Sequence, residues 1–398
     1  MRRIDTWMGW PLAALLGLWP RQKRALPECP GQIVIVKLSG LGSLLVCAGV
    51  FRALRVRQPQ ARLVLVALDG TAAAAKLIPE VDEVLAISAA GLLPLLRDGW
   101  HVLRTLRARR VDVIADIEYF SKLSTLFCFL SGARYRLGFR LSARWRGRLI
   151  DGGIAFREDI HFCECVARLL YPLGVDYRQL SMEQVTLPDA AEQLAAELLA
   201  TAAGGAAGGS WAAVNPHATA LCVQRRWPLE RFAQVMDILL QANPELRILL
   251  PGTTEERARA EQLRALVAAE LRDRVCVLAG RTDVETLAAV LGRCRLVLTG
   301  DTGVMHLAAA VGAPLVALFG PESPVRYGPV AGENAAVQRD HPKARILQGS
   351  VPCGPCLSYM NHKRAPCGAE PAACMLAISV EQVVRACGDV LSQKMQYI

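Results

Sequence analysis

Short apolar runs alternate with amphipathic stretches along most of this chain of 398 residues. Each run is long enough for one strand, and each stretch has the spacing of a helix with one apolar face. Alternation of this kind predicts βαβ units built on a parallel sheet. In the first half we expect strands at residues 33–38, 61–68, 81–87 and 111–117, with helices at 44–57, 71–78 and 122–130.

The alternation is interrupted by the sequence TAAGGAAGGS at residues 201–210, whose small side chains leave little to bury. Apolar runs then resume, and the later strands are expected at 211–216, 247–252, 275–280, 296–300 and 314–320. We therefore predict an N-terminal domain over 25–190, a Gly/Ala-rich linker over 191–210 and a C-terminal domain over 211–398.

The composition indicates a globular protein with an anionic partner. Hydrophobic residues make up 53% of the chain and aromatic residues only 6%, so the cores should be aliphatic. The formal net charge is +10, but no zinc-finger, RNP or helix-turn-helix signature accompanies it, so we expect no nucleic-acid partner. An anionic membrane surface or a phosphorylated glycolipid explains the charge. The arginine-rich stretch at 134–148 is either a solvated face or a site for such an acceptor.

The first 24 residues form a basic, tryptophan-rich segment. Arg2 and Arg3 precede an apolar stretch at 7–19, and three more basic residues follow it. The stretch is shorter than the roughly 20 residues that span a bilayer. We interpret residues 1–24 as an amphipathic helix in a membrane interface. A capping helix packed on its own domain and a signal peptide are the alternatives, although no small-residue cleavage site follows.

Cysteine usage indicates a reducing compartment, because most of the 13 cysteines are single and lie in apolar stretches. We therefore expect a cytoplasmic protein. The exception is a cluster with the spacing Cys-x2-Cys-x10-Cys-x6-Cys, formed by Cys353, Cys356, Cys367 and Cys374. Four thiolates can complete a tetrahedral set, so a structural zinc or iron–sulfur site is one interpretation of the cluster. Reduced thiols or a local disulfide are the other.

A small polar turn follows the strand expected at 296–300. The turn contains Asp301, Thr302 and Gly303, and an apolar helical pattern that includes His306 comes next. Unpaired N–H groups at the start of such a helix suit a phosphate. Asp301 could then hold hydroxyl groups while His306 donates a hydrogen bond to an anionic oxygen. The alternative is a simple helix cap followed by core packing.

Three motifs in this order resemble the heptosyltransferase family of glycosyltransferases, which transfers a sugar from a nucleotide diphosphate to lipopolysaccharide core. They are KLSGLGSLL at 37–45, NPHATALCVQRRWPLERF at 215–232 and the run that starts with GDTG at 300–329. The resemblance implies an α/β fold of two Rossmann-like domains facing across a cleft, the GT-B architecture. It also implies an inverting transferase at the inner membrane, with ADP-heptose as donor, a lipopolysaccharide core or other glycolipid as acceptor, and no cofactor required for catalysis.

The resemblance assigns the donor site to the C-terminal domain. It implies that Thr219 and the basic pair Arg225 and Arg226 hold the donor's phosphates. Gly252 and Glu255 follow a strand, where an acidic residue could hold ribose hydroxyls; a first-turn glutamate that stabilises a helix dipole is the alternative. The remaining donor residues implied are Asp301, Thr302, Gly303 and His306.

The catalytic base is the point at which this sequence departs from the family. Ser43 stands where relatives commonly carry Asp, and a serine without a neighbouring base is a poor proton acceptor. Asp116 or Glu118, at the end of a first-domain strand, could substitute for it, and Asp301 is a further catalytic candidate. The departure also leaves open a non-catalytic relative that binds glycan or nucleotide without turnover.

Overall fold

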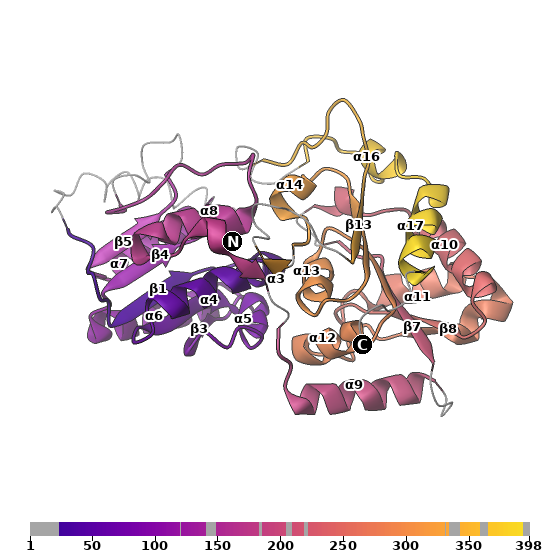
Figure 1. The fold of residues 1–398 in the computed structure, drawn as a ribbon, viewed down its shortest axis with the longest axis horizontal. Helices are drawn as coiled ribbons and strands as arrows, with labels where there is room; N and C mark the ends of the chain where they lie inside the picture. The colour runs from indigo at the N-terminus through magenta and orange to yellow at the C-terminus, as the bar shows by residue number, and fades with distance from the viewer. Residues whose placement is uncertain are drawn as a thin grey trace. The chain divides into compact units, whose positions relative to one another are not determined.

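The computed structural model describes residues 24–119, 121–140, 149–182, 185–203, 209–218, 222–330, 332–333, 343–358 and 365–392. The chain divides into two compact units, Met1–Ser181 and Met182–Ile398, and each is built around its own sheet (Figure 1). Of the predicted amphipathic segment, residues 1–23 lie outside this description. No helix within the described ranges is both long and apolar enough to cross a membrane.

The sheet of the first unit has five parallel strands in the order β3-β2-β1-β4-β5. Its strands are β1 (Gln32–Val36), β2 (Arg62–Leu68), β3 (Glu83–Ile87), β4 (Val113–Asp116) and β5 (Tyr135–Gly138). Its helices are α3 (Leu41–Leu45), α4 (Ala48–Arg57), α5 (Asp69–Ala75), α6 (Leu92–Arg109), α7 (Lys122–Leu130), α8 (Phe162–Leu170) and the short η2 (Tyr171–Leu173) and η3 (Tyr177–Gln179). The short strand β6 (Ser181–Met182) follows.

The central strand β1 is buried on both faces, as expected of a parallel strand covered by helices. In the register of the sheet Val36 lies opposite Val66 on one side and Asp116 on the other. The carboxyl ends of these three strands therefore meet at one edge. The chain order reverses between β1 and β4, which makes that point of the edge a typical place for a ligand.

The sheet of the second unit has six parallel strands in the order β13-β11-β10-β7-β8-β9. They are β7 (Ser210–Asn215), β8 (Leu246–Leu250), β9 (Val275–Val277), β10 (Leu296–Gly300), β11 (Leu315–Phe319) and β13 (Ala344–Gln348), with β12 (Gly332–Glu333) outside this sheet. The helices are α9 (Asp189–Ala202), η4 (Val223–Arg225), α10 (Leu229–Ala242), α11 (Arg257–Leu266), η5 (Ala269–Arg274), α12 (Val284–Gly292), α13 (Gly303–Ala310), α14 (Pro324–Tyr327), α16 (Ala373–Leu376) and α17 (Val380–Ser392).

The order of the second sheet also reverses once, between β7 and β10, so each unit has the strand order of a Rossmann-type sheet. The two units confirm the predicted α/β fold class with two Rossmann-like domains. Helix α9 covers much of the range that we predicted as a linker, and residues 204–208 of that range lie outside the described residues. The domain limits inferred from the sequence stay predictions.

Helix α17 completes the core of the second unit, and Figure 1 shows it beside α10. The Trp227 ring is fully buried and meets Phe232 edge-on, with ring centroids 4.9 Å apart. Its indole N–H donates to the carbonyl oxygen of Ile378, 3.1 Å away, and the Arg231 guanidinium donates to the same oxygen at 2.7 Å. These bonds hold the turn before α17 against α10.

Candidate functional site

The reversal point of the second sheet is organised by one asparagine. Asn215 ends β7 directly opposite Thr299 of β10. Its side-chain amide donates to the hydroxyl oxygens of Thr299 and Thr302, each at 3.0 Å. Because Asn215 is buried, these bonds fix the turn after β10 to the end of the neighbouring strand.

Helix α13 begins at this turn without a side-chain cap. Thr302 is the N-cap residue in extended conformation, and its hydroxyl bonds to Asn215 and Thr299 instead of capping the helix. Gly303 follows as the first helical residue. The amides of the first turn therefore keep their capacity to bind an anion at the positive end of the helix dipole.

Asp301 is buried beside this helix start and is paired with Arg225. The Arg225 guanidinium lies 3.2 Å from Asp301 Oδ2 and 3.3 Å from Glu322 Oε2, so one arginine joins two carboxylates. Glu322 is fully buried and also lies 3.4 Å from the Arg326 guanidinium. Two cations and two anions thus form one buried cluster, which we call the Arg225 cluster.

The Arg225 cluster keeps Arg225 charged. Burial alone would lower the pKa of Arg225, but the negative charges of Asp301 and Glu322 outweigh it and raise the pKa above its usual range. The cation that the sequence assigns to the donor's phosphates is therefore already neutralised by carboxylates in this conformation. Arg225 can meet a phosphate only by sharing or exchanging one of these partners.

His306 and Arg226, the other donor candidates near this turn, have different surroundings. His306 lies on α13 three residues after Gly303 and is only 6% exposed. Arg226 forms an ion pair with Glu370 at 3.0 Å, and both side chains are partly exposed. Thr219 lies outside the described residues.

A second group of candidates lies where β8 ends. A side chain at Gly252 would place its Cβ 2.8 Å from His217 Nε2, so a glycine is needed for the close approach of the His217 ring. Glu255 is exposed, and a hydrogen bond from Thr253 lowers the pKa of its carboxyl group. The adjacent Glu256 accepts a bond from the Thr253 amide at 2.9 Å and is less exposed.

His217, Glu322 and Arg326 were missed by the sequence reasoning. His217 is 4% exposed, and burial is the main reason that its pKa is lowered, so the ring is neutral at pH 7. Asp301 directly follows an apolar run, whereas Glu322 comes three residues after Phe319, the last residue of the next run. The run's end is therefore a weaker signal for Glu322.

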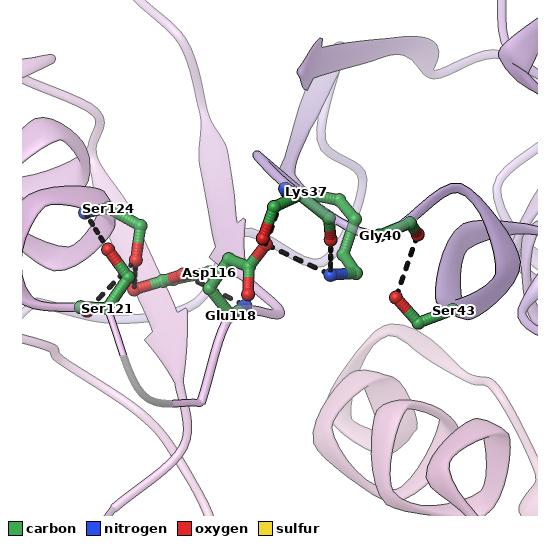
Figure 2. Close-up of polar contacts among 8 residues, drawn as sticks. Lys37, Gly40, Ser43, Asp116, Glu118, Ser121 and Ser124 are labelled. Carbon is green, nitrogen blue, oxygen red and sulfur yellow. Dashed lines mark hydrogen bonds and ion pairs between the residues drawn. The ribbon is translucent and has the colours of Figure 1, made fainter. Parts of the chain in front are cut away.

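The reversal point of the first sheet holds a buried ion pair (Figure 2). Lys37, just after β1, lies 2.9 Å from Glu118 Oε1, and both side chains are at most 4% exposed. The amide of Ser39 donates to the same oxygen at 2.8 Å. The loops after β1 and β4 are therefore joined by a charge-assisted contact.

Asp116 serves as an acceptor for the start of α7. Its carboxylate receives hydrogen bonds from the hydroxyls of Ser124 at 3.1 Å and Thr125 at 2.7 Å, and from the Glu118 amide at 3.1 Å. It is fully buried. This geometry disfavours a role as base, because the lone pairs of Asp116 are directed at protein donors; the role stays a prediction.

Ser43 lies in the first turn of α3, and its hydroxyl donates to the Gly40 carbonyl oxygen at 2.8 Å. Figure 2 shows this hydroxyl turned toward Gly40 and away from Glu118. The structure thus does not bring Ser43 together with Asp116 or Glu118 in a hydrogen-bonded group. Neither carboxylate drawn in Figure 2, Asp116 or Glu118, contacts the Ser43 hydroxyl.

None of the four clustered cysteines forms a disulfide. Burial is the main cause that raises the pKa of Cys356 to about 11, and the neighbouring Cys367 and Cys374 add to it. Nowhere in the described ranges do three His, Cys, Asp or Glu side chains gather closely enough to hold a metal ion. As they lie here, the cysteines do not form a ligand set, and the structural metal stays a prediction.

Comparison with known proteins points to one family. The model of glycosyltransferase family 9 (heptosyltransferase) matches residues 100–350. The chain is 25% identical over 311 residues to lipopolysaccharide heptosyltransferase 2 of Salmonella typhimurium, an alignment that covers 74% of this chain and 84% of that protein. It is also 34% identical over 127 residues to lipooligosaccharide heptosyltransferase 2 of Haemophilus influenzae. That alignment covers 32% of this chain and 34% of the relative, about a third of its length.

Solved structures support the same architecture. The fold is similar to that of ADP-heptose lipopolysaccharide heptosyltransferase II from Escherichia coli, with a TM-score of 0.71, 20% identity and coverage of 91% of this chain and 99% of that one. A family 9 glycosyltransferase from Veillonella parvula gives a TM-score of 0.72 at 20% identity, covering 93% and 99% of the two chains. These likenesses concern the fold and confirm the expected GT-B class.

Proposed function

Because this chain belongs to glycosyltransferase family 9 (heptosyltransferase), we propose that it transfers a heptose from ADP-heptose to lipopolysaccharide core or a related surface glycan. The observation that carries this proposal is the uncapped start of α13 beside the Arg225 cluster at the reversal point of the second sheet. Helix amides and a guanidinium at one sheet edge are the groups that a leaving diphosphate requires.

The proposed reaction is a single displacement with inversion. An acceptor hydroxyl attacks the anomeric carbon, the bond between that carbon and the β-phosphate oxygen breaks, and ADP leaves with the electron pair. The first-turn amides of α13 and Arg225 stabilise the negative charge that develops on the diphosphate. Asp301 and His306 orient the sugar, while Gly252 and Glu255 receive the nucleoside. No cofactor takes part in this scheme, and the proton of the hydroxyl passes to a base.

The experiment combines binding and turnover. Thermal shifts with ADP-heptose, GDP-mannose and UDP-glucose test the donor, because a ligand bound only by the folded protein raises the melting temperature. We expect the largest shift with ADP-heptose. Release of ADP in the presence of an acceptor, with the anomeric configuration of the product read by NMR, tests transfer and inversion. Binding of ADP-heptose without release of ADP would instead support the non-catalytic alternative, which the position of Ser43 favours.

Membrane association is part of the proposal and rests on the basic N-terminal segment and the net charge of +10. We place the protein at the cytoplasmic face of the inner membrane. Deletion of residues 1–24 should release it from anionic vesicles and leave transfer to a soluble acceptor unchanged. If the shortened chain still sedimented with lipid, the arginine-rich stretch at 134–148 would be the better candidate; its residues 141–148 lie outside the described residues.

The structural zinc or iron–sulfur site stays a proposal for Cys353, Cys356, Cys367 and Cys374. A metal there would have to draw the four thiols closer than they lie in the structure. Elemental analysis of the purified protein tests it, with Cys276→Ser as the control for an unclustered thiol. One equivalent of zinc, or two to four of iron, lost in Cys356→Ser and retained in Cys276→Ser, would support the site; an absence of metal would reject it.

A further inference from the structure

We propose that the first unit binds a sugar that carries an oxyanion, either a phosphate or a carboxylate, in a cavity beside α8. The cavity has a volume of about 470 Å³, which is within the size range of small-molecule sites. All of its lining residues belong to the unit Met1–Ser181. The proposal is independent of the donor site, which lies in the other unit.

The lining of this cavity is cationic and aromatic. Three arginines and two tyrosines contribute to it, namely Arg157, Arg168, Arg178, Tyr171 and Tyr177, together with apolar residues such as Ile160. No carboxylate is part of the lining. Arginine binds phosphate and carboxylate groups through paired N–H donors, so a cavity with three of them is suited to an oxyanion.

Arg168 is held in place before any ligand arrives. Its Nε and one terminal nitrogen lie 2.8 and 2.7 Å from Glu164 Oε1. Its guanidinium also lies 3.8 Å from the ring centroid of Tyr177. Because Glu164 is itself buried, Arg168 loses little further conformational freedom when it binds.

Arg157 and Arg178 are the arginines that an anion can engage. The Arg178 guanidinium lies 4.9 Å from the Tyr177 ring centroid, and no ion pair is formed by it within the described part of the chain. Asp176 caps the backbone amide of Arg178 at 3.0 Å. Arg157 pairs with Asp159 at the surface, where an ion pair contributes little and can be exchanged for a ligand.

One end of the cavity adjoins the carboxyl end of β4. Phe156, between two lining residues, stacks on Tyr119 with ring centroids 4.2 Å apart and an interplanar angle of 9°. Tyr119 directly follows Glu118, the partner of Lys37 at the reversal point. From there the lining follows α8 to Tyr171, the residue directly after that helix.

The tyrosines indicate a sugar ring in addition to the oxyanion. The Tyr171 side chain is 57% exposed although it is large and aromatic, and it borders the cavity. An exposed ring with a hydroxyl at its edge can pack against the apolar face of a pyranose and hydrogen-bond to its hydroxyls. Inorganic phosphate would use the arginines alone, whereas a sugar phosphate would use both.

Titration calorimetry of the full chain without donor tests the proposal. The probes are glucose 6-phosphate, glucuronate, glucose and inorganic phosphate, of which the first two distinguish the two oxyanions. We expect at least one of these two to bind more tightly than inorganic phosphate, and glucose not to bind. Arg178→Gln should weaken binding at least tenfold, and Arg178→Lys should weaken it less. Tyr171→Ala should weaken sugar phosphate but not inorganic phosphate.

Arg104→Gln is the matched control, because Arg104 is an exposed arginine of α6 in the same unit and does not line the cavity. Its binding should equal that of the unmodified protein. The proposal is overturned if neither charged sugar binds at millimolar concentration, if Arg178→Gln and Arg104→Gln bind alike, or if inorganic phosphate binds as tightly as the sugars. Because no nucleotide is used, these outcomes leave the proposed transfer reaction untouched.

Discussion

Arg225 lies 3.2 Å from Asp301, so the cation expected to hold the donor's phosphates is paired with the carboxylate expected to hold its hydroxyls. Glu322 binds the other side of the same guanidinium. The two residues therefore cannot act independently, and changing either alters the charge balance around the other.

The first prediction concerns Arg225. Arg225→Ala should lower turnover by roughly 10²–10³, the usual cost of losing one electrostatic donor in the transition state. It should also lower stability by about 3–5 kcal/mol, because Asp301 loses its buried partner. Arg225→Lys separates the effects, since it keeps the charge and should recover stability more fully than turnover. Steady-state kinetics and urea unfolding measure both; Arg281→Ala, at an exposed arginine of the same unit, is the control. Equal turnover in the two alanine variants would remove Arg225 from the site.

Asp301→Asn is the second test. Asparagine has nearly the same volume but no charge, so the fold should be retained while Arg225 keeps only Glu322 as an anionic partner. We expect binding of free ADP to stay the same or strengthen, because Arg225 is less neutralised, and transfer of the sugar to be lost. Calorimetry with ADP and a transfer assay check the two outcomes. Loss of cooperative unfolding would show that Asp301 has a mainly structural role.

A third prediction follows from the position of Ser43. Neither Asp116 nor Glu118 lies free at the edge of the first sheet, because both accept hydrogen bonds from protein donors. Ser43→Asp should therefore raise the transfer rate by supplying a proton acceptor, at a stability cost of about 1 kcal/mol for the lost bond to Gly40. Ser43→Asn has the same shape without the base and should not raise the rate. Identical rates in the two variants would exclude this position.

Asp116→Asn completes that comparison. If Asp116 only anchors the start of α7, the variant should unfold at lower urea concentration with an unchanged transfer rate. A sharp fall in rate at unchanged stability would instead identify Asp116 as the substitute base. Glu118→Gln, measured in parallel, reports on the ion pair with Lys37.

The fourth prediction concerns pH. Burial lowers the pKa of His217, and the nearby cations of Arg259 and Arg226 act in the same direction while Glu256 opposes them. The unfolded chain therefore takes up a proton near pH 6.5 before the folded chain does, and stability should fall as the pH drops below that value. The loss approaches about 1.4 kcal/mol for each unit by which the pKa is lowered. Urea unfolding at pH 7.5 and 5.5 should show a smaller difference for His217→Asn; an unchanged difference would assign the effect to other groups.

The sequence predicted nine of the eleven strands in the two main sheets, because buried parallel strands are continuous apolar runs. It missed β5 and β13, whose runs are short and contain arginine. The polar residues after β7 and β10 were also identified, because the end of an apolar run can be read directly from the sequence. The sequence did not identify which side chains pair with one another. Lys37 and Glu118 are 81 positions apart, and Arg225 and Glu322 are 97 apart. Such contacts depend on the order of strands in a sheet, which alternation alone does not specify.

The helix α9 shows a different limit. Its residues are rich in alanine, leucine and glutamate, which favour a helix, but the glycines that follow dominated the prediction of a linker. A boundary drawn at the first small residues of a break extends too far when those residues are alanines, because alanine is both small and the strongest helix former.

The late position of α17 has a consequence for synthesis of the protein. Val383, Cys387 and Val390 of this helix cover the core of the second unit, although nearly 170 residues separate β7 from the start of the helix. A chain emerging from the ribosome must therefore carry the open apolar face of a six-stranded sheet until α17 has been translated. This interval is when the nascent chain should depend most on chaperones.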